Sequence, residues 1–312
     1  MIEYWFMIRI IIRTNGEQLL IHLSSVWKII NASHPQGLRE KLMEKIMKDL
    51  SESSLVAAIE ANLFEIFLLF KQWPQAEIHD SPELLWTITE IPFSLFNSIL
   101  RPRLSPDIVD DAIDAAIARC KSKNVPMIWF TGPSTKPADL GSRLLERGFR
   151  HYESPGMAAD LDSLPENLQS PQSFVIKRVD SDEDLRKWCQ IMCDVFEMPK
   201  FVEDAWLDFK LSLGFDSSLP IRHYLGSLND EVVSTSTLFL GAGVAGIYDV
   251  STLDRARRKG IGSAMTAIPL MEARGLGYRV GILNSSEIGF NVYRRVGFQE
   301  YCMINQYVWP VS

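Results

Sequence analysis

The sequence has few cysteines and few histidines, and this scarcity limits the kinds of site that it can hold. Its 312 residues include four cysteines and five histidines. Four cysteines without a disulfide framework favour a reducing compartment. Cys189 and Cys193 lie one turn apart on a predicted helix, but without a nearby histidine or further cysteine they are interpreted as buried thiols. The sequence therefore predicts neither a disulfide scaffold nor a metal site.

Residues 1–12 are not expected to form a leader or a membrane segment, and the chain has no excess of positive charge. Residues 1–12 are apolar but are interrupted by Glu3 and Arg9, so they are too short and too charged to cross a bilayer. They also lack a signal-peptide cleavage pattern. The net charge of −7 argues against nucleic acid as a main partner and favours a cationic one. We expect a cytoplasmic protein without membrane or nucleic-acid partners, and either a monomer or a homodimer.

What the chain does contain is a basic, glycine-containing loop between a strand-like run and a helix-like run. This loop reads Arg257-Arg258-Lys259-Gly260-Ile261-Gly262. Two glycines let a ligand approach the backbone, and the N–H groups that open a helix have no partners within it. The helix dipole and three cations then favour a bound diphosphate. The short pattern should occur by chance in roughly 0.15 of chains this long, so the flanking elements must support the assignment.

Those flanking elements have the expected order. Residues 231–240 and 244–250 are rich in Val, Thr and Phe and predict two strands joined by a turn at 241–243. Ile261, Met265 and Ile268 recur at helical spacing after the loop, with Pro269 expected to kink or shorten that helix. The remaining expected elements are a strand at 279–283, a helix at 288–296 after Ser285-Ser286-Glu287, and a final strand at 301–309.

Two spaced motifs together resemble the GNAT superfamily of acyl-CoA-dependent N-acyltransferases. They are Arg257-x-x-Gly260-x-Gly262 and Ser286-x-x-Gly289-x-x-x-Tyr293-x-x-x-Gly297-Phe298. The resemblance covers about 174–312, with a first strand at 174–179 and a capping box, Ser181-x-x-Asp184, opening the first helix. The family often has Asn where this chain has Ser286, and a residue other than proline where it has Pro269.

The resemblance implies acetyl-CoA as co-substrate, no metal, and direct attack of an amine on the thioester in a ternary complex. The implied cofactor-binding residues are Val250, Ser251, Thr252, Arg257, Arg258, Lys259, Gly260, Ile261, Gly262, Ser263 and Ser286. Tyr293 occupies the family's general-acid position. Because an ordinary tyrosine is a weaker acid than a thiol by about 1.5 pKa units, or roughly 2 kcal/mol, we expect a hydrogen bond rather than full proton transfer.

The sequence leaves the general base open, although the amine must lose its proton before it attacks. Asp249 is one candidate, but the alternation of side chains along a strand could direct its carboxylate away from the cleft. His223, Glu231 and a chain of water molecules are the alternatives.

The first half of the chain reads as a second, altered copy of the same fold. Aligning Gly148-Phe149 with Gly297-Phe298 superposes a strand at 126–130, a helix at 137–148 and a following strand on the second copy. The first copy has Leu144 where the second has Tyr293. Its loop at 101–106 contains two prolines and no glycine pair, so it offers a diphosphate fewer N–H groups.

These observations predict an α/β (α+β) fold of two GNAT-like domains, each with a mixed, mostly antiparallel central sheet flanked by helices. The expected boundaries are an N-terminal extension or capping segment at 1–50, a degenerate domain at 51–164, a polar linker at 165–173 and a catalytic domain at 174–312. An acceptor loop is expected at 198–215, where Trp206 and Phe209 face either the core or the substrate.

The leading functional hypothesis is an N-acetyltransferase acting on a small-molecule amine or a peptide amine. The alternative is a CoA-binding sensor or pseudoenzyme, and a third hypothesis is an interaction protein that keeps only the fold. Tyr293 and the intact glycine pair favour the first.

Overall fold

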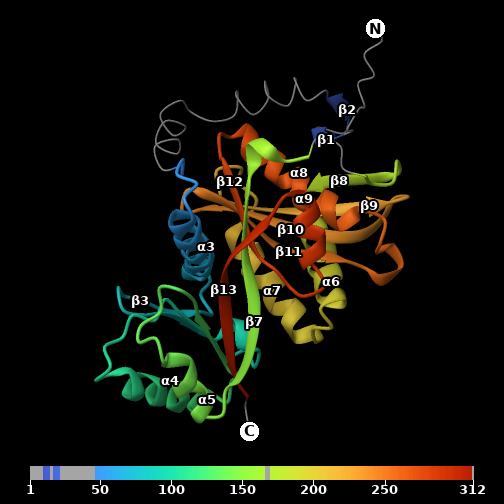
Figure 1. Ribbon diagram of the computed structural model, residues 1–312. Coiled ribbons are helices and arrows are strands. Elements are labelled where there is room, and N and C mark those ends of the chain that lie inside the picture. The colour runs from blue at the N-terminus through green and yellow to red at the C-terminus, as the bar shows by residue number, and fades with distance from the viewer. Residues whose placement is uncertain (1–9, 15–16, 22–45, 166–168, 311–312) are drawn as a thin grey trace. The chain divides into compact units, whose positions relative to one another are not determined.

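The computed structural model describes residues 10–14, 17–21, 46–165 and 169–310 (Figure 1). Its contacts divide the chain into two compact units that are not contiguous in sequence. The first unit takes residues 1–48, 160–198 and 215–281, and the second takes 49–159, 199–214 and 282–312. This grouping differs from the contiguous halves expected at 51–164 and 174–312. Most of the expected N-terminal extension at 1–50 and the centre of the linker lie outside the described residues.

The first unit is built on an antiparallel sheet in the order β11-β10-β9-β8. Two helices, α6 and α8, pack against strands of this sheet, and the hairpin β10–β11 leads through the short turn η4 into α8. A separate antiparallel pair, β1 and β2, belongs to the same unit. The elements are β1 (Ile10–Thr14), β2 (Glu17–Ile21), η3 (Leu161–Ser163), β8 (Phe174–Arg178), α6 (Asp182–Val195), β9 (Ile221–Leu228), β10 (Glu231–Gly241), β11 (Val244–Thr252), η4 (Asp254–Ala256) and α8 (Ile261–Gly275).

Local sequence signals place these elements well. The Ser181 hydroxyl accepts from the Asp184 N–H at 3.3 Å, which is the N-cap predicted for the first helix. Helix α8 runs through Pro269 to Gly275 without being shortened, contrary to one of the two expected outcomes. Pro269 is buried in α8, where tertiary packing stabilises the helix beyond its intrinsic propensity.

The second unit contains a mixed sheet in the order β3-β4-β5-β6-β13-β7, in which only β5 and β6 run parallel among the described pairs. Its elements are α3 (Glu52–Phe67), η1 (Leu68–Gln72), β3 (Glu77–Asp80), β4 (Leu85–Ile88), η2 (Ser94–Phe96), β5 (Ser98–Leu100), α4 (Val109–Lys123), β6 (Met127–Thr131), α5 (Leu140–Glu146), β7 (Arg150–Asp160), α7 (Lys200–Leu213), α9 (Phe290–Val296) and β13 (Gln299–Trp309). Strand β12 (Val280–Asn284) spans the boundary between the units.

The C-terminal strand β13 is one reason why the two units are not contiguous in sequence. It pairs antiparallel with both β6 and β7, with Tyr307 opposite Trp129 and Ile304 opposite Ser154. Tyr307 and Trp309 join the apolar cluster that contains Trp129 and Val109. The expected catalytic domain at 174–312 therefore gives its last strand to the sheet of the N-terminal half.

Helix α7 also packs within the second unit. The Phe209 ring stacks on Phe70, with centroids 4.3 Å apart and planes at 1°, and Trp206 lies 4.8 Å from Phe96. Asp208 accepts from Trp73 Nε1 at 2.8 Å. Phe209 therefore faces the core, which decides one of the alternatives left open by the sequence.

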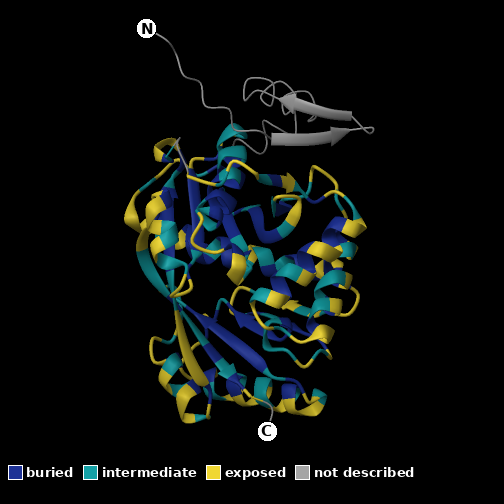
Figure 2. Ribbon diagram, turned by 90° about the vertical axis from the view of Figure 1, so that its right-hand side faces the viewer, coloured by how far each residue is buried: buried dark blue, intermediate teal, exposed yellow. Residues whose placement is uncertain are grey.

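Buried residues, dark blue in Figure 2, concentrate on the strands and on the inward sides of the helices. Trp73 and Trp129 are both buried. Within the described part of the chain, one helical stretch, Glu52–Gln72, is long and apolar enough to cross a membrane. It carries core residues of the second unit, among them Leu55, Ile59 and Leu63.

Candidate functional site

The basic loop lies in the first unit, where β11 and the turn η4 lead into α8. Its backbone is left-handed at Arg258 (φ 61°) and at Gly260 (φ 82°), which is the N-cap of α8. The first intrahelical bond runs from the Ala264 N–H to the Gly260 carbonyl at 3.1 Å. The N–H groups of Ile261, Gly262 and Ser263 therefore open the helix without an acceptor within it.

The cations of this loop differ in how they are held. Arg255 pairs with Glu231, and Arg257 bonds to the Thr252 carbonyl at 3.0 Å as well as to Asp254 at 2.8 Å. Lys259 donates to the Arg255 main-chain carbonyl in η4 at 3.2 Å. Within the described residues Arg258 makes no ion pair or side-chain hydrogen bond, and it is exposed. Arg258 is therefore the loop cation that is most available to an anion.

Besides the left-handed backbone, a steric contact also favours glycine at position 260. A Cβ at this position would lie 1.9 Å from the Gln169 main-chain oxygen. The group that closely approaches Gly260 is therefore the chain's own segment at 169–170. The sequence pattern attributed this glycine to ligand approach, and the structure adds an intramolecular requirement.

The strand before the loop carries a β-bulge at Asp249. Tyr248 is opposite Thr237 and Ser251 is opposite Thr235, so two residues of β11 face only Ser236 of β10. Asp249 adopts φ 53°, a left-handed conformation that Asp tolerates better than most residues. A bulge redirects side chains, and here the Asp249 carboxylate accepts from the Thr237 hydroxyl at 2.9 Å.

The three residues that follow Asp249 are the expected contacts of the coenzyme's pantetheine arm. Ser251 is buried, and its hydroxyl lies 2.6 Å from that of Thr235. Val250 and Thr252 are partly exposed. The side chain of Ser251 is thus used inside the protein, which leaves main-chain contacts as the role implied for this residue.

Tyr293 and Ser286 lie in the second unit, on and before α9. The Ser286 hydroxyl accepts from the Gly289 N–H at 3.2 Å, so it caps the turn that opens α9 as predicted, although α9 begins at Phe290 rather than at 288. A Cβ on Gly289 would lie 2.6 Å from a ring carbon of Tyr293. The spacing Ser286-x-x-Gly289-x-x-x-Tyr293 therefore has a physical basis. Ser286 caps the turn, Gly289 leaves space because it has no side chain, and the Tyr293 ring occupies that space.

The electrostatic environment of Tyr293 is apolar. Its ring lies 6.2 Å from that of Phe298 in an edge-on arrangement. Loss of solvation raises the pKa of Tyr293 to about 12. Its hydroxyl therefore stays protonated across the physiological range and is a weaker acid than an ordinary tyrosine.

The predicted site residues between positions 249 and 263 all lie in the first unit. Ser286 and Tyr293 lie in the second. The other base candidates from the sequence diverge: His223 is buried 2.8 Å from Thr237, whereas Glu231 is exposed and paired with Arg255. Cys189 and Cys193 are buried. Sequence reasoning missed Thr237 and Thr235, because only the strand register shows that they meet the bulge.

The two segments interpreted as a repeat have closely similar local structures. β6–α5–β7 and β12–α9–β13 contain elements of 5, 7 and 11 residues each. Gly148 (φ 86°) and Gly297 (φ 110°) end the two helices. Both helices are followed by a bond from a phenylalanine N–H: Phe149 to Leu144 O at 3.2 Å and Phe298 to Tyr293 O at 3.1 Å.

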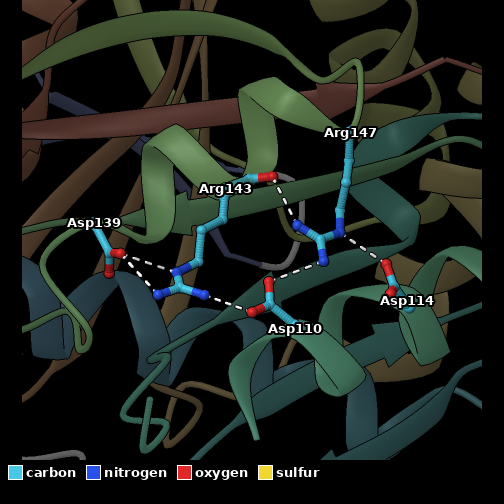
Figure 3. Close-up of polar contacts among 5 residues, drawn as sticks. All are labelled: Asp110, Asp114, Asp139, Arg143 and Arg147. Carbon is cyan, nitrogen blue, oxygen red and sulfur yellow. Dashed lines mark hydrogen bonds and ion pairs between the residues drawn. The ribbon is translucent and has the colours of Figure 1, made fainter. Parts of the chain in front are cut away.

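The helix start in the first copy is built differently. Helix α4 carries Asp110 and Asp111 in its first turn, whereas α8 has no acidic residue there. Asp110 pairs with Arg143 at 2.5 Å and with Arg147 at 2.8 Å, which ties this helix start to α5 and the residue that follows it (Figure 3). Arg143 and Arg147 also pair with Asp139 and Asp114, respectively. Carboxylates at this position would repel a diphosphate.

Comparisons with known proteins give structural likeness only. No family model and no curated protein sequence matches the chain. Among solved structures, it is similar to a GCN5-related N-acetyltransferase from Kribbella flavida, with a TM-score of 0.62 and 18% identity over 80% of this chain and 95% of that one. A GCN5-related N-acetyltransferase from Sphaerobacter thermophilus gives 0.56 and 17%, over 83% and 92%.

A tandem GNAT protein from the clavulanic acid biosynthesis pathway is also similar, with a TM-score of 0.51 and 11% identity over 77% of this chain and 84% of that one. The predicted fold class is confirmed by these likenesses and by the mixed sheet with its flanking helices. The chain has the fold of the GNAT N-acetyltransferases.

Proposed function

We propose that this protein is an acyltransferase that moves an acetyl group from acetyl-CoA to a primary amine. The observation that carries the proposal is the basic loop at 257–260, which leads from the bulged strand β11 into the open N-terminus of α8. A loop of this kind combines cations, a helix dipole and main-chain donors, all of which favour a diphosphate. Its occurrence within a GNAT fold supports coenzyme A as the ligand.

In this proposal the pyrophosphate binds the N–H groups of Ile261, Gly262 and Ser263, with Arg258 as the uncommitted cation. The pantetheine arm runs along β11 after the bulge, where Val250 and Thr252 are partly exposed. An extended ligand can bind main-chain groups of a strand much as another strand does. Backbone donors at this point would also polarise the thioester carbonyl.

The amine attacks the thioester carbon directly, a C–N bond forms, and the C–S bond breaks to release the coenzyme thiolate. We assign Tyr293 to the leaving sulfur as a hydrogen-bond donor. With a pKa of about 12, Tyr293 is a weaker acid than an ordinary thiol by about 3.5 units. Full proton transfer from Tyr293 would cost about 5 kcal/mol, so stabilisation of the thiolate by a hydrogen bond is the better description.

We also propose that the N-terminal copy is a degenerate GNAT-like domain. Its α4 helix start is occupied by Asp110 and Asp111, and a buried Leu144 stands where the second copy has Tyr293. The main-chain N–H of Leu104, in the loop before α4, is already bonded to Lys136 O at 3.1 Å. One coenzyme site per chain, in the cytoplasm and without a metal, completes the proposal.

The first test is a calorimetric titration of the full chain with acetyl-CoA. The proposal predicts saturable binding to one site. Absence of binding would contradict both the enzyme and a CoA-binding sensor.

The second test is a screen of small and peptide amines for thiol release from acetyl-CoA. Turnover of at least one amine supports the enzyme, whereas binding without turnover on a broad panel favours the sensor. Tyr293→Phe serves as the matched variant, because it keeps the ring in the gap beside Gly289 and removes only the hydroxyl.

A further inference from the structure

The polar residues behind the β11 bulge form a connected network on one side of the first unit's sheet. His223 of β9 lies opposite Thr237 of β10, and His223 Nδ1 is 2.8 Å from Thr237 Oγ1. The Thr237 hydroxyl in turn donates to Asp249 Oδ2 at 2.9 Å. His223 packs against Trp188 of α6, with ring centroids 4.8 Å apart. The network therefore links side chains of β9, β10 and β11, and Trp188 of α6 packs against its histidine.

The direction of each hydrogen bond follows from the number of available protons. An ionised carboxylate only accepts hydrogen bonds, and a hydroxyl has a single proton. Since Thr237 gives its proton to Asp249, it must accept from His223, which places a proton on Nδ1 of the imidazole. The network thus supports a negative charge on Asp249 with two successive donors.

The main chain of the bulge is held separately from this carboxylate. Thr235 Oγ1 donates to the Asp249 carbonyl at 2.8 Å and lies 2.6 Å from Ser251 Oγ. Thr235 and Thr237 are both fully buried. One threonine therefore fixes the backbone at φ 53° and the other aims the side chain, which remains partly exposed. A strained position that its surroundings fix in two independent ways is a candidate for function.

We propose that Asp249 binds the charged ammonium group of the acceptor amine, and that Thr237 and His223 position it. This inference rests on the proposed function, because Asp249 directly precedes the residues assigned to the pantetheine arm. It names the substrate class as an amine that carries a positive charge when it binds. It also gives Asp249, one of the base candidates from the sequence, the role of a binding residue.

Proton affinity favours an anchor over a base. In water, carboxylic acids are more acidic than alkylammonium ions by roughly six pKa units, a factor of about a million. A carboxylate therefore holds an ammonium ion in place far more readily than it deprotonates it. The proton then leaves to water before the neutral amine attacks.

The equilibrium test uses butylammonium as the probe and 1-pentanol as the uncharged control, titrated by calorimetry into the full chain with and without coenzyme A. Asp249→Asn keeps the shape of the side chain, and Asn also tolerates the left-handed backbone. We expect about tenfold weaker butylammonium binding in this variant and no change for pentanol. Equal butylammonium affinity in both proteins, or no binding by the wild type, would overturn the proposal.

Thr237 variants test the positioning role. Thr237→Val removes the hydroxyl at nearly constant volume, and Thr237→Ser restores it. We expect the KM for ethylamine to rise about threefold in Thr237→Val with kcat nearly unchanged, and to return in Thr237→Ser. A KM that rises equally in both variants would indicate a packing effect and overturn the role of the hydroxyl.

Comparison of two amines separates the anchor from a base. 2,2,2-Trifluoroethylamine is close in size to ethylamine but largely uncharged at pH 8. An anchor predicts that Asp249→Asn raises the KM for ethylamine alone. A fall in kcat for ethylamine alone would instead identify a base and overturn the anchor. Failure of the wild type to bind acetyl-CoA would refute the proposed function. The butylammonium titration would still test independently whether Asp249 binds an ammonium group.

Discussion

Gly260 offers the sharpest test of how the basic loop is built. Replacing it with alanine forces a Cβ into a left-handed backbone, which costs roughly 1–2 kcal/mol. The same Cβ would lie 1.9 Å from the Gln169 main-chain oxygen, so the segment at 169–170 must move. Overpacking of this kind typically costs about 1–3 kcal/mol. We therefore expect Gly260→Ala to lose about 2–5 kcal/mol of stability.

At about 2–4 °C per kcal/mol, the scaling for domains of roughly 150–250 residues, a loss of this size should lower the Tm by roughly 4–20 °C. Thermal unfolding followed by circular dichroism measures the shift, and calorimetry measures acetyl-CoA affinity, which should fall at least about tenfold. The control is Gly275→Ala at the other end of α8, where a Cβ meets nothing within 4 Å. That change should leave the protein equally stable or up to about 1 kcal/mol more stable.

Gly260→Asn separates the two costs. Asn tolerates a left-handed backbone but still carries a Cβ. If the contact with Gln169 dominates, Asn should be nearly as harmful as Ala; if backbone strain dominates, Asn should recover most of the loss. A Tm for Gly260→Ala within about 2 °C of the wild type would refute the reasoning altogether. Lost acetyl-CoA binding with unchanged stability would show that the glycine serves the ligand alone.

Four other changes test the remaining conclusions. Tyr293→Phe should lower thiol release at least about tenfold and leave acetyl-CoA affinity unchanged. Because the pKa of Tyr293 is about 12, the unmodified protein should lose this hydrogen-bond donor only as the pH rises toward 12. A fall in rate near pH 10 that depends on the tyrosine would contradict the assignment. Arg258→Ala should weaken acetyl-CoA binding about threefold to tenfold at low salt, whereas Arg255→Ala, already paired with Glu231, should change it little; equal effects would count against Arg258. Phe209→Ala should lower the free energy of unfolding in urea by about 3–5 kcal/mol, because it removes the ring that stacks on Phe70. If Phe209→Ala cost less than Phe209→Leu, loss of this stack would be excluded as the cause. Asp110→Asn should lower the Tm more at low salt than at 0.5 M salt, since Asp110 receives two arginines; a salt-independent shift would argue against this electrostatic role.

Short-range patterns predicted much of the candidate site. The hairpin at 231–250, the helix start at Gly260, the cap at Ser286 and the turn at Gly297 all follow from contacts between residues within a few positions of one another. Such interactions are encoded locally, so a motif with correct spacing specifies them. The roles of Tyr293 and of the basic loop stay predictions.

Long-range geometry was not accessible to the same reasoning. Strand alternation left the direction of Asp249 open, and the bulge opposite Ser236 decided it by bringing the carboxylate to Thr237. Trp206 and Phe209 had two possible environments, and the aromatic cluster around Phe70 decided for Phe209. In both cases the deciding partner comes from another element.

The sequence by itself determined the order of the elements, the capped helix starts, the glycine turns and the resemblance to a GNAT fold, because these depend on local backbone preference and on residue spacing. The tertiary structure alone decided that β13 completes the sheet of the N-terminal half, that Gln169 packs against Gly260, and that loss of solvation raises the pKa of Tyr293 to about 12. Strand pairing, close packing and desolvation all depend on residues far apart in the chain, and no local pattern specifies them.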